Sequence, residues 1–154
     1  MVEVGQMAPD AAFEMADGKR ASIADWRGQK LVIYFYPKDD TGGCTKEAQA
    51  FSLLLPDFAK ANTAVLGMSK DSVASHKKFI GKYQLDVALG SDGDGSACDA
   101  FGVWVEKSMY GRNYMGIERS TFLIGADGKI SEIWRKVKVA GHAESVLETA
   151  RALN

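Results

Sequence analysis

The chain has 154 residues, of which 19 are Lys or Arg and 20 are Asp or Glu, so its formal net charge is −1. This length favours one domain over residues 1–154, with a hydrophobic core of its own. The balanced charge excludes the positive field by which many proteins recruit nucleic acid, and no apolar run approaches the ~20 residues of a membrane-spanning helix, so neither nucleic acid nor a membrane is an expected partner.

The cysteine content and the first residues indicate a reducing compartment. Two cysteines in a chain of this length do not form a disulfide scaffold. The opening sequence, MVEVGQMAPD, lacks the basic and apolar regions of a signal peptide. We therefore expect a cytoplasmic protein.

The first third of the chain leads into a buried strand. Residues 1–20 contain the turn signal Asp17-Gly18 and predict short extended pieces or a hairpin. Residues 21–30 predict a single helical turn. Residues 31–36 are continuously apolar and rich in β-branched and aromatic side chains, which is typical of a strand covered on both faces. Pro37 cannot donate to a ladder and ends this strand.

The middle of the chain alternates helices and strands. Apolar residues after Cys44 recur with helical spacing, and Pro56 predicts a kink or a break about three turns into that helix. Residues 63–69 predict a second buried strand. Asp71 or Ser72 then caps another helix.

The next segment is rich in turn signals. Residues 85–90 predict a weaker strand, and the turn at residues 91–96 opens a short helix that contains Cys98. The same turn, SDGDGS, does not fit a calcium loop, because Glu106 does not lie at the twelfth position. Residues 103–112 mix aromatic and charged side chains without a period, which predicts an exposed loop.

The chain ends in a predicted hairpin and helix. Residues 120–125 and 130–137 flank the turn sequence Ala-Asp-Gly-Lys and predict two antiparallel strands. An amphipathic helix follows from Gly141. This order of elements favours an α/β domain with a mixed central sheet covered on both faces.

Cys44 is the strongest candidate for chemistry. It lies where a strand passes into a helix, and the positive end of a helix stabilises a thiolate, the reactive form of cysteine. The alternative is a small buried hydrophobic residue, but the flanking residues 39–43 are Asp, Asp, Thr, Gly and Gly rather than core residues. We therefore favour a nucleophile.

The spacing Pro37-x-x-x-Thr41-x-x-Cys44 resembles the active-site signature of the peroxiredoxins. The context YFYPKDDTGGCTKEA, together with YGRNYMGIERSTFLIGADGKI at residues 110–130, is most similar to the bacterioferritin comigratory protein branch, also called the Q type. The resemblance covers nearly the whole chain. It implies a thioredoxin-like fold, with a mixed central β-sheet flanked by helices on both faces, and a peroxidase that uses no cofactor and no metal.

The resemblance also implies roles for individual residues. Cys44 would attack the peroxide, Pro37 would shield the thiolate from water, and Thr41 would orient the peroxide. Arg119, in the second motif GIERSTF, would address both the sulfur and the developing oxyanion. Glu47, about one helical turn after Cys44, would hold Arg119. The alternative for Arg119 is a surface salt bridge to a neighbouring acidic residue.

The chain departs from the family pattern in three places. Gly42 stands where the family commonly has proline, and Gln49 and Ile80 stand where members of this branch often have a partner cysteine. Cys98 is the one internal candidate for resolving a sulfenic acid on Cys44, although its apolar neighbours fit a packing cysteine equally well. We favour resolution by an external thiol.

The sequence thus predicts a thiol peroxidase that reduces hydrogen peroxide and organic hydroperoxides through a Cys44 sulfenic acid. Thioredoxin, glutaredoxin or a small thiol would supply the reductant, and the protein would be a monomer or a weak dimer. The alternative is a thioredoxin-fold redox sensor or partner-binding protein without efficient turnover. The presence of Pro37, Thr41, Cys44 and Arg119 together favours the enzyme. We assign no chemistry to His76.

Overall fold

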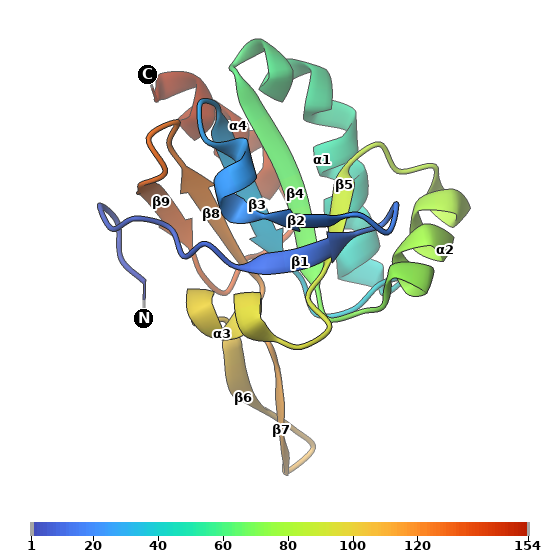
Figure 1. Ribbon diagram of the computed structural model, residues 1–154. Coiled ribbons are helices and arrows are strands. Elements are labelled where there is room, and N and C mark those ends of the chain that lie inside the picture. Colours follow the sequence, from blue (N-terminus) through green and yellow to red (C-terminus); the bar gives the residue numbers. More distant parts are fainter. Residues whose placement is uncertain (1, 154) are drawn as a thin grey trace.

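The computed structural model describes residues 2–153, so the first and last residues of the expected domain lie outside it. A seven-stranded sheet, in the order β2-β1-β5-β4-β3-β8-β9, runs through the molecule, and a separate two-stranded hairpin projects from it (Figure 1). The strands are β1 (Ala12–Met15), β2 (Arg20–Ser22), β3 (Lys30–Phe35), β4 (Thr63–Ser69), β5 (Ala88–Ser91), β6 (Trp104–Met109), β7 (Arg112–Ile117), β8 (Ser120–Ile124) and β9 (Ile130–Trp134). The helices are η1 (Ile23–Trp26), α1 (Gly42–Lys60), α2 (Val73–Tyr83), α3 (Ser96–Phe101) and α4 (His142–Ala152).

Strand β3 lies at the centre of the fold. It pairs parallel to β4 and antiparallel to β8, and all six of its residues are buried. Val32 and Tyr34 pack into one hydrophobic cluster, whereas Ile33 and Phe35 pack into a second. Because successive side chains of a strand point to opposite faces, this alternation places one cluster on each face of the sheet. The continuous apolar run in the sequence follows from burial on both faces.

The two faces carry different helices. Side chains of α1, α2 and α4 contribute to the cluster that contains Tyr34, and side chains of η1 and α3 contribute to the cluster that contains Phe35. The expected mixed sheet with helices on both faces is therefore confirmed. Helix α3 is short, so the loop before β1 and the β1–β2 hairpin help to cover its side of the sheet.

Of the kink or break expected from sequence at Pro56, the break does not occur. Helix α1 continues through Pro56 to Lys60. A proline in a helix interior costs about 3 kcal/mol, partly through one lost hydrogen bond. Phe51 and Phe58, on either side of Pro56, are both 0% exposed, and their burial offsets that cost. Packing outweighs local propensity here.

The prediction of an exposed loop over residues 103–112 is wrong. Strands β6 and β7 form a regular antiparallel ladder, joined by a two-residue turn at Tyr110 and Gly111. Both turn residues have positive φ, 52° and 76°, as in the tight turns that suit a twisted hairpin. The hairpin stands away from the body, so neither of its faces shows the hydrophobic alternation by which strands are recognised (Figure 1).

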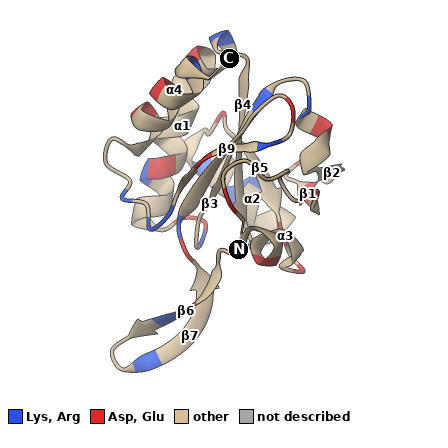
Figure 2. Ribbon diagram, turned by 90° about the vertical axis from the view of Figure 1, so that its left-hand side faces the viewer, with Lys and Arg blue, Asp and Glu red and all other residues tan. Residues whose placement is uncertain are grey.

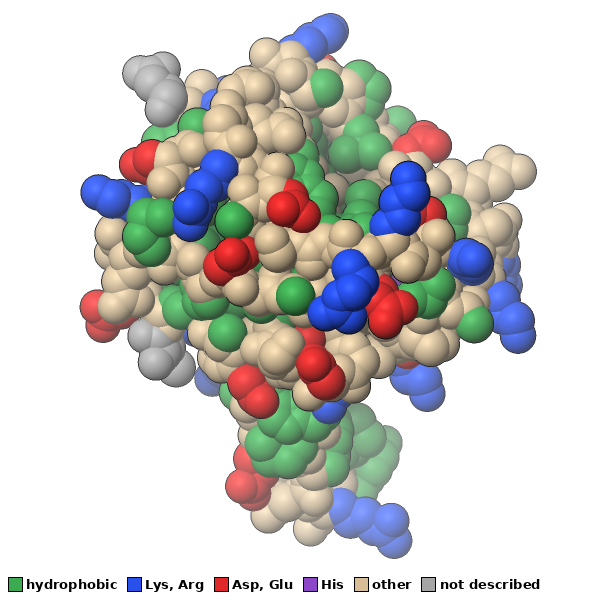
Figure 3. Space-filling view, in the orientation of Figure 1, with side chains coloured by type: hydrophobic (Ala, Val, Ile, Leu, Met, Phe, Trp, Pro, Cys, Tyr) green, Lys and Arg blue, Asp and Glu red, His purple; other side chains and the backbone are tan. Residues whose placement is uncertain are grey.

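The surface agrees with the near-neutral charge. Basic and acidic residues are interspersed along the elements (Figure 2). Hydrophobic side chains gather on the projecting hairpin, where Met109, Tyr110, Tyr114 and Met115 are all exposed (Figure 3). Among residues 2–153, none of the helices combines the length and the apolar character needed to cross a bilayer.

Candidate active site

Cys44 lies in the first turn of α1, directly after the loop that follows β3. The N-cap of this helix is Thr41, and its first hydrogen bond runs from the Thr45 N–H to the Thr41 carbonyl at 2.9 Å. The N–H groups of Gly43 and Cys44 precede that bond and belong to the orphan donors of a helix start. Cys44 is 1% exposed, so its sulfur lies at the positive end of a helix in a site largely shielded from water.

Arg119 reaches the cysteine from the other half of the chain. Its Nη2 donates to Cys44 Sγ at 3.2 Å, and its Nη1 donates to Glu47 Oε1 at 2.6 Å. Arg119 lies between β7 and β8, and β8 is the direct neighbour of β3 in the sheet. The pairing of Glu47 with Arg119 is confirmed. One planar guanidinium therefore connects the thiol to a buried carboxyl group.

Burial determines the charge of this site. It raises the pKa of Glu47 to about 7, even though Arg119 favours the ionised carboxylate. The second oxygen, Glu47 Oε2, is buried without a hydrogen-bond partner among residues 2–153. Burial alone would lower the pKa of Arg119, but Glu47 and Cys44 outweigh it and raise that pKa above its ordinary value. The guanidinium thus carries a fixed positive charge beside the sulfur.

The two glycines before Cys44 differ in their surroundings. A Cβ at Gly43 would lie 3.2 Å from Arg119 Nη2, whereas a Cβ at Gly42 would meet nothing within 4 Å. Gly43 therefore allows the guanidinium to approach the helix start closely. At Gly42, where the family commonly has proline, there is room for a side chain.

Thr41 and Pro37 are exposed residues of the loop that leads to Cys44. The Thr41 hydroxyl donates to the Lys38 carbonyl at 2.8 Å, so its oxygen can act as an acceptor towards a bound peroxide. Pro37 is exposed and lines an open groove of about 400 Å³. The groove continues over Trp104 and Met115 of the hairpin. The sequence did not predict that the hairpin lines this groove, because residues 103–112 were interpreted as a loop.

Lys107 of β6 also lines this groove. Its pKa is lowered, first by burial and then by repulsion from Arg119, so its ammonium group lies within the field of the active site. The mixture of apolar and charged residues in 103–112 therefore includes side chains that line a groove. A two-residue turn with glycine at its second position was the available signal for a hairpin.

Cys98 lies on the other side of the sheet. It is 0% exposed and packs in the cluster with Phe35 and α3, whereas Cys44 packs in the cluster with Tyr34 and α1. Burial raises the pKa of the Cys98 thiol, and Asp92 raises it further. Both cysteines are free. The structure therefore does not bring the two sulfurs together.

A second histidine lies near the site. His142, the first residue of α4, shares a hydrogen bond of 2.8 Å between its Nε2 and the Thr121 hydroxyl. Burial and, less strongly, Arg119 lower its pKa to about 4, so the ring is neutral. The ring packs edge-on against Phe51 and Trp134 as an uncharged side chain.

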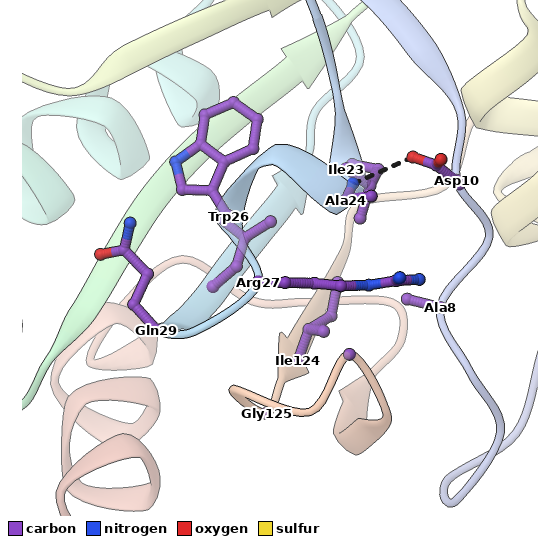
Figure 4. A pocket seen from close by; sticks show the side chains of 11 residues that line it. Ala8, Asp10, Ile23, Ala24, Trp26, Arg27, Gln29, Ile124 and Gly125 are labelled. Atoms are coloured by element: carbon purple, nitrogen blue, oxygen red, sulfur yellow. Dashed lines mark hydrogen bonds between the residues drawn. The ribbon is translucent and has the colours of Figure 1, made fainter.

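A small pocket between η1 and the turn after β8 contains none of the predicted site residues (Figure 4). Leu31, near the start of strand β3, lines this pocket, whereas Cys44 follows the opposite end of that strand. Its acidic residue, Asp10, accepts a hydrogen bond from the Ala24 N–H at 2.9 Å. Asp10 thus fixes the η1 turn.

The geometry of the cysteine site agrees with comparisons to known proteins. The model of the AhpC/TSA family matches residues 4–133. The chain belongs to this family. It is 49% identical over 143 residues to peroxiredoxin Bcp of Xanthomonas campestris pv. campestris, covering 93% of this chain and 89% of the relative. It is 41% identical over 153 residues to peroxiredoxin Bcp of Bacillus subtilis, covering 99% and 98%.

Solved structures of the family show the same fold. A cysteine-to-serine mutant of Xylella fastidiosa PrxQ matches with a TM-score of 0.94 and 44% identity, covering 99% of this chain and 97% of that one. The Xanthomonas campestris bacterioferritin comigratory protein, studied for its alkyl peroxide reduction, matches with a TM-score of 0.91 and 45% identity, covering 97% and 98%. The resemblance to the Bcp or Q-type peroxiredoxins is confirmed, and with it the thioredoxin-like fold and the thiol peroxidase activity.

Proposed function

We propose that the protein reduces hydrogen peroxide and alkyl hydroperoxides at Cys44 and that an external thiol completes the cycle. The observation that carries the first part is the contact between Arg119 Nη2 and Cys44 Sγ at 3.2 Å, inside a site that is largely shielded from bulk water. A guanidinium at that distance stabilises both a thiolate and the negative charge that leaves with the peroxide oxygen. These are the two anions of the reaction.

In the proposed step the thiolate attacks one peroxide oxygen. A sulfur–oxygen bond forms, the oxygen–oxygen bond breaks, and its electron pair leaves on the second oxygen, which takes up a proton to become water or an alcohol. Arg119 and the N–H groups of Gly43 and Cys44 donate to the oxygen on which charge develops. The Thr41 hydroxyl, already donating to its own loop, accepts from the peroxide O–H. Cys44 is left as a sulfenic acid.

The groove beside the site supports alkyl hydroperoxides as substrates. Pro37, Trp104, Met115 and Ile117 give it apolar walls, and Pro37 belongs to the loop that leads to Cys44. An alkyl chain lying there would leave water, at roughly 25 cal/mol for each Å² of apolar surface buried. The Xanthomonas campestris relative was likewise studied for alkyl peroxide reduction.

The position of Cys98 supports an external resolving thiol. A disulfide requires Cα atoms within about 7 Å, and the central sheet separates the two clusters in which Cys44 and Cys98 pack. The raised pKa of Cys98 also keeps it in the unreactive thiol form. Thioredoxin, glutaredoxin or a small thiol would attack the sulfenic acid, and a second thiol would release Cys44. We infer a monomer or a weak dimer for this cycle.

The test is to treat the reduced protein with one equivalent of peroxide and to examine it by intact mass and non-reducing peptide mapping. We expect a sulfenic acid on Cys44 and, after a small thiol is added, a mixed disulfide there. Cys44→Ser should abolish peroxide consumption, whereas Cys98→Ala should keep it. A Cys44–Cys98 disulfide in high yield, with turnover lost in Cys98→Ala, would overturn the external-thiol cycle.

A further inference from the structure

His76 lies in a buried polar cluster behind the active-site loop. It belongs to α2 and is 0% exposed. Its Nδ1 lies 2.7 Å from Asp39 Oδ2, and its Nε2 lies 2.8 Å from the Gly90 carbonyl oxygen in β5. Both ring nitrogens thus face an acceptor.

Asp39 belongs to the loop between Pro37 and Thr41. Its carboxyl group also accepts from the Tyr36 hydroxyl at 2.6 Å and from the Ser75 hydroxyl at 2.8 Å. Burial opposes ionisation of Asp39, but the hydrogen bonds from His76 and Tyr36 outweigh it and lower its pKa. A carboxylate and a carbonyl oxygen carry no proton to donate. The ring completes both contacts only as an imidazolium with two N–H groups.

The same loop is also attached through its backbone and through Asp40. The Asp39 N–H donates to Asp71 Oδ2 at 2.9 Å, in the turn before α2. Asp40 pairs with Lys82 and Tyr83 at the far end of α2, but that pair is exposed and contributes little. The buried attachment of the loop to α2 is therefore made by Asp39, which binds both His76 and Ser75.

Two further titratable groups face the ring. The Tyr36 hydroxyl lies 3.4 Å from His76 Nδ1. A carboxylate oxygen of Asp71 lies within 4.8 Å of a ring nitrogen of His76 and of a carboxylate oxygen of Asp39. The Asp71 oxygen is engaged by the Ser69 hydroxyl at 2.6 Å. Carboxylate oxygens therefore lie near the ring from the loop, at Asp39, and from the turn before α2, at Asp71.

We propose that His76 is a positioning residue for the peroxidase reaction, and that its second ring proton holds the Pro37–Thr41 loop in place beside Cys44. When the ring loses that proton as the pH rises, one of its two N–H contacts becomes a contact between two acceptors. The loop then shifts, and Pro37 and Thr41 no longer match the peroxide position. The proposal rests on peroxide reduction at Cys44, and is independent of which thiol resolves it.

The first test joins NMR spectroscopy with kinetics. Nitrogen shifts of the His76 ring are followed from mildly acidic to alkaline pH in the reduced protein, and the rate of Cys44 oxidation by hydrogen peroxide is measured by stopped flow over the same range. We expect the rate to fall at alkaline pH with the midpoint at which the ring loses one proton. Ionisation of a thiol has the opposite sign, since it raises the rate with pH. The proposal would be overturned if one ring nitrogen of His76 were unprotonated at every pH. It would also be overturned if the rate of Cys44 oxidation did not change over the pH range in which the ring titrates.

The second test uses variants. His76→Gln should lower the rate by up to about a hundredfold, as a misplacement of about 1 Å can do, and should remove the alkaline fall. Asp39→Asn, which keeps the shape of the side chain, should move both the ring titration and the fall in rate to lower pH. If His76→Gln does not fold, the Asp39→Asn variant still decides the question. A shift in the midpoint of the ring titration without the same shift in the midpoint of the rate, or the reverse, would contradict the proposal.

Ser72→Ala is the matched control. Ser72 caps α2 by accepting from the Ser75 N–H at 3.1 Å, so its loss weakens the same helix without touching the His76 ring. The alkaline fall should persist in this variant, and its loss there would show a general effect of helix stability instead. Failure of peroxide reduction itself would be visible in the wild-type protein, whereas the NMR titration does not depend on turnover.

Discussion

At the scale of single residues, the shape of the Arg119 side chain matters as much as its charge. Its two terminal nitrogens serve different partners, Cys44 Sγ and Glu47 Oε1, from one rigid plane. A lysine ammonium is a point charge on a flexible stem and cannot fix both contacts in the same geometry. The carboxyl group aims the cation at the sulfur.

Arg119→Lys should therefore be impaired although the charge is kept. Loss of one such donor costs about 3 kcal/mol in the barrier, or about a hundredfold in the rate of peroxide reduction measured by stopped flow. Arg20→Lys is the control, because Arg20 is exposed and only loosely paired with Glu14 at 3.9 Å. If lysine at position 119 reacted as fast as arginine, the geometric role of this residue would have to be abandoned.

At the scale of elements, the backbone at the start of α1 is compatible with a proline at position 42, where this chain has glycine. Gly42 is the first residue of the helix, where the N–H is not needed and a fixed φ is favourable. Thr41 before it is extended, with φ −106° and ψ 157°, as a residue before proline must be. A Cβ at Gly42 meets no atom within 4 Å.

Gly42→Pro should accordingly raise the free energy of unfolding by about 0.4–1 kcal/mol, because it restricts the unfolded chain. Urea denaturation measures this change. Gly42→Ala and Gly43→Ala form a matched pair for the peroxide rate, and only the second should be slowed, since its Cβ would press on Arg119. An equal loss of rate in both would place the effect in the helix start as a whole.

The elements also show what the sequence could and could not predict. The buried strand β3, the helix after Cys44 and the closing hairpin were predictable, because burial on one or both faces leaves a period in the sequence. The β6–β7 hairpin left none, since both its faces meet solvent or the groove. The cysteine motif predicted Arg119 and Glu47 only through family resemblance. His76 carries no local signal, because its partners lie on the β3–α1 loop and on β5.

At the scale of the whole molecule, two buried groups near the site respond to pH in opposite ways. The raised pKa of Glu47, about 7, means that the folded state takes up a proton before the unfolded chain does as the pH falls. The lowered pKa of His142, about 4, means that the folded state takes it up later. Glu47 therefore adds stability as the pH falls from about 7, and His142 removes stability below its ordinary pKa of 6.5.

The two effects should nearly cancel in the wild-type protein, so its stability should change little in mildly acidic solution. Glu47→Gln should remove the compensating contribution of Glu47, so that the contribution of His142 can be measured. In this variant the free energy of unfolding should fall as the pH drops from 6.5 towards 4, by no more than about 3 kcal/mol. His142→Asn should show the reverse slope. Urea denaturation at a series of pH values measures both, and parallel slopes in the two variants would contradict this account.

The contact between Cys44 and Arg119 spans 75 residues of sequence. Cys44 leaves the ribosome with β3 and the start of α1, whereas Arg119 follows only after β7 has been made. Until then the thiol lacks its cation and has only the general reactivity of an ordinary cysteine. Activation is thus a late step in building the molecule: a nascent chain that ends before Arg119 contains the nucleophile in a latent form, and β8 must dock beside β3 before it can react quickly with peroxide.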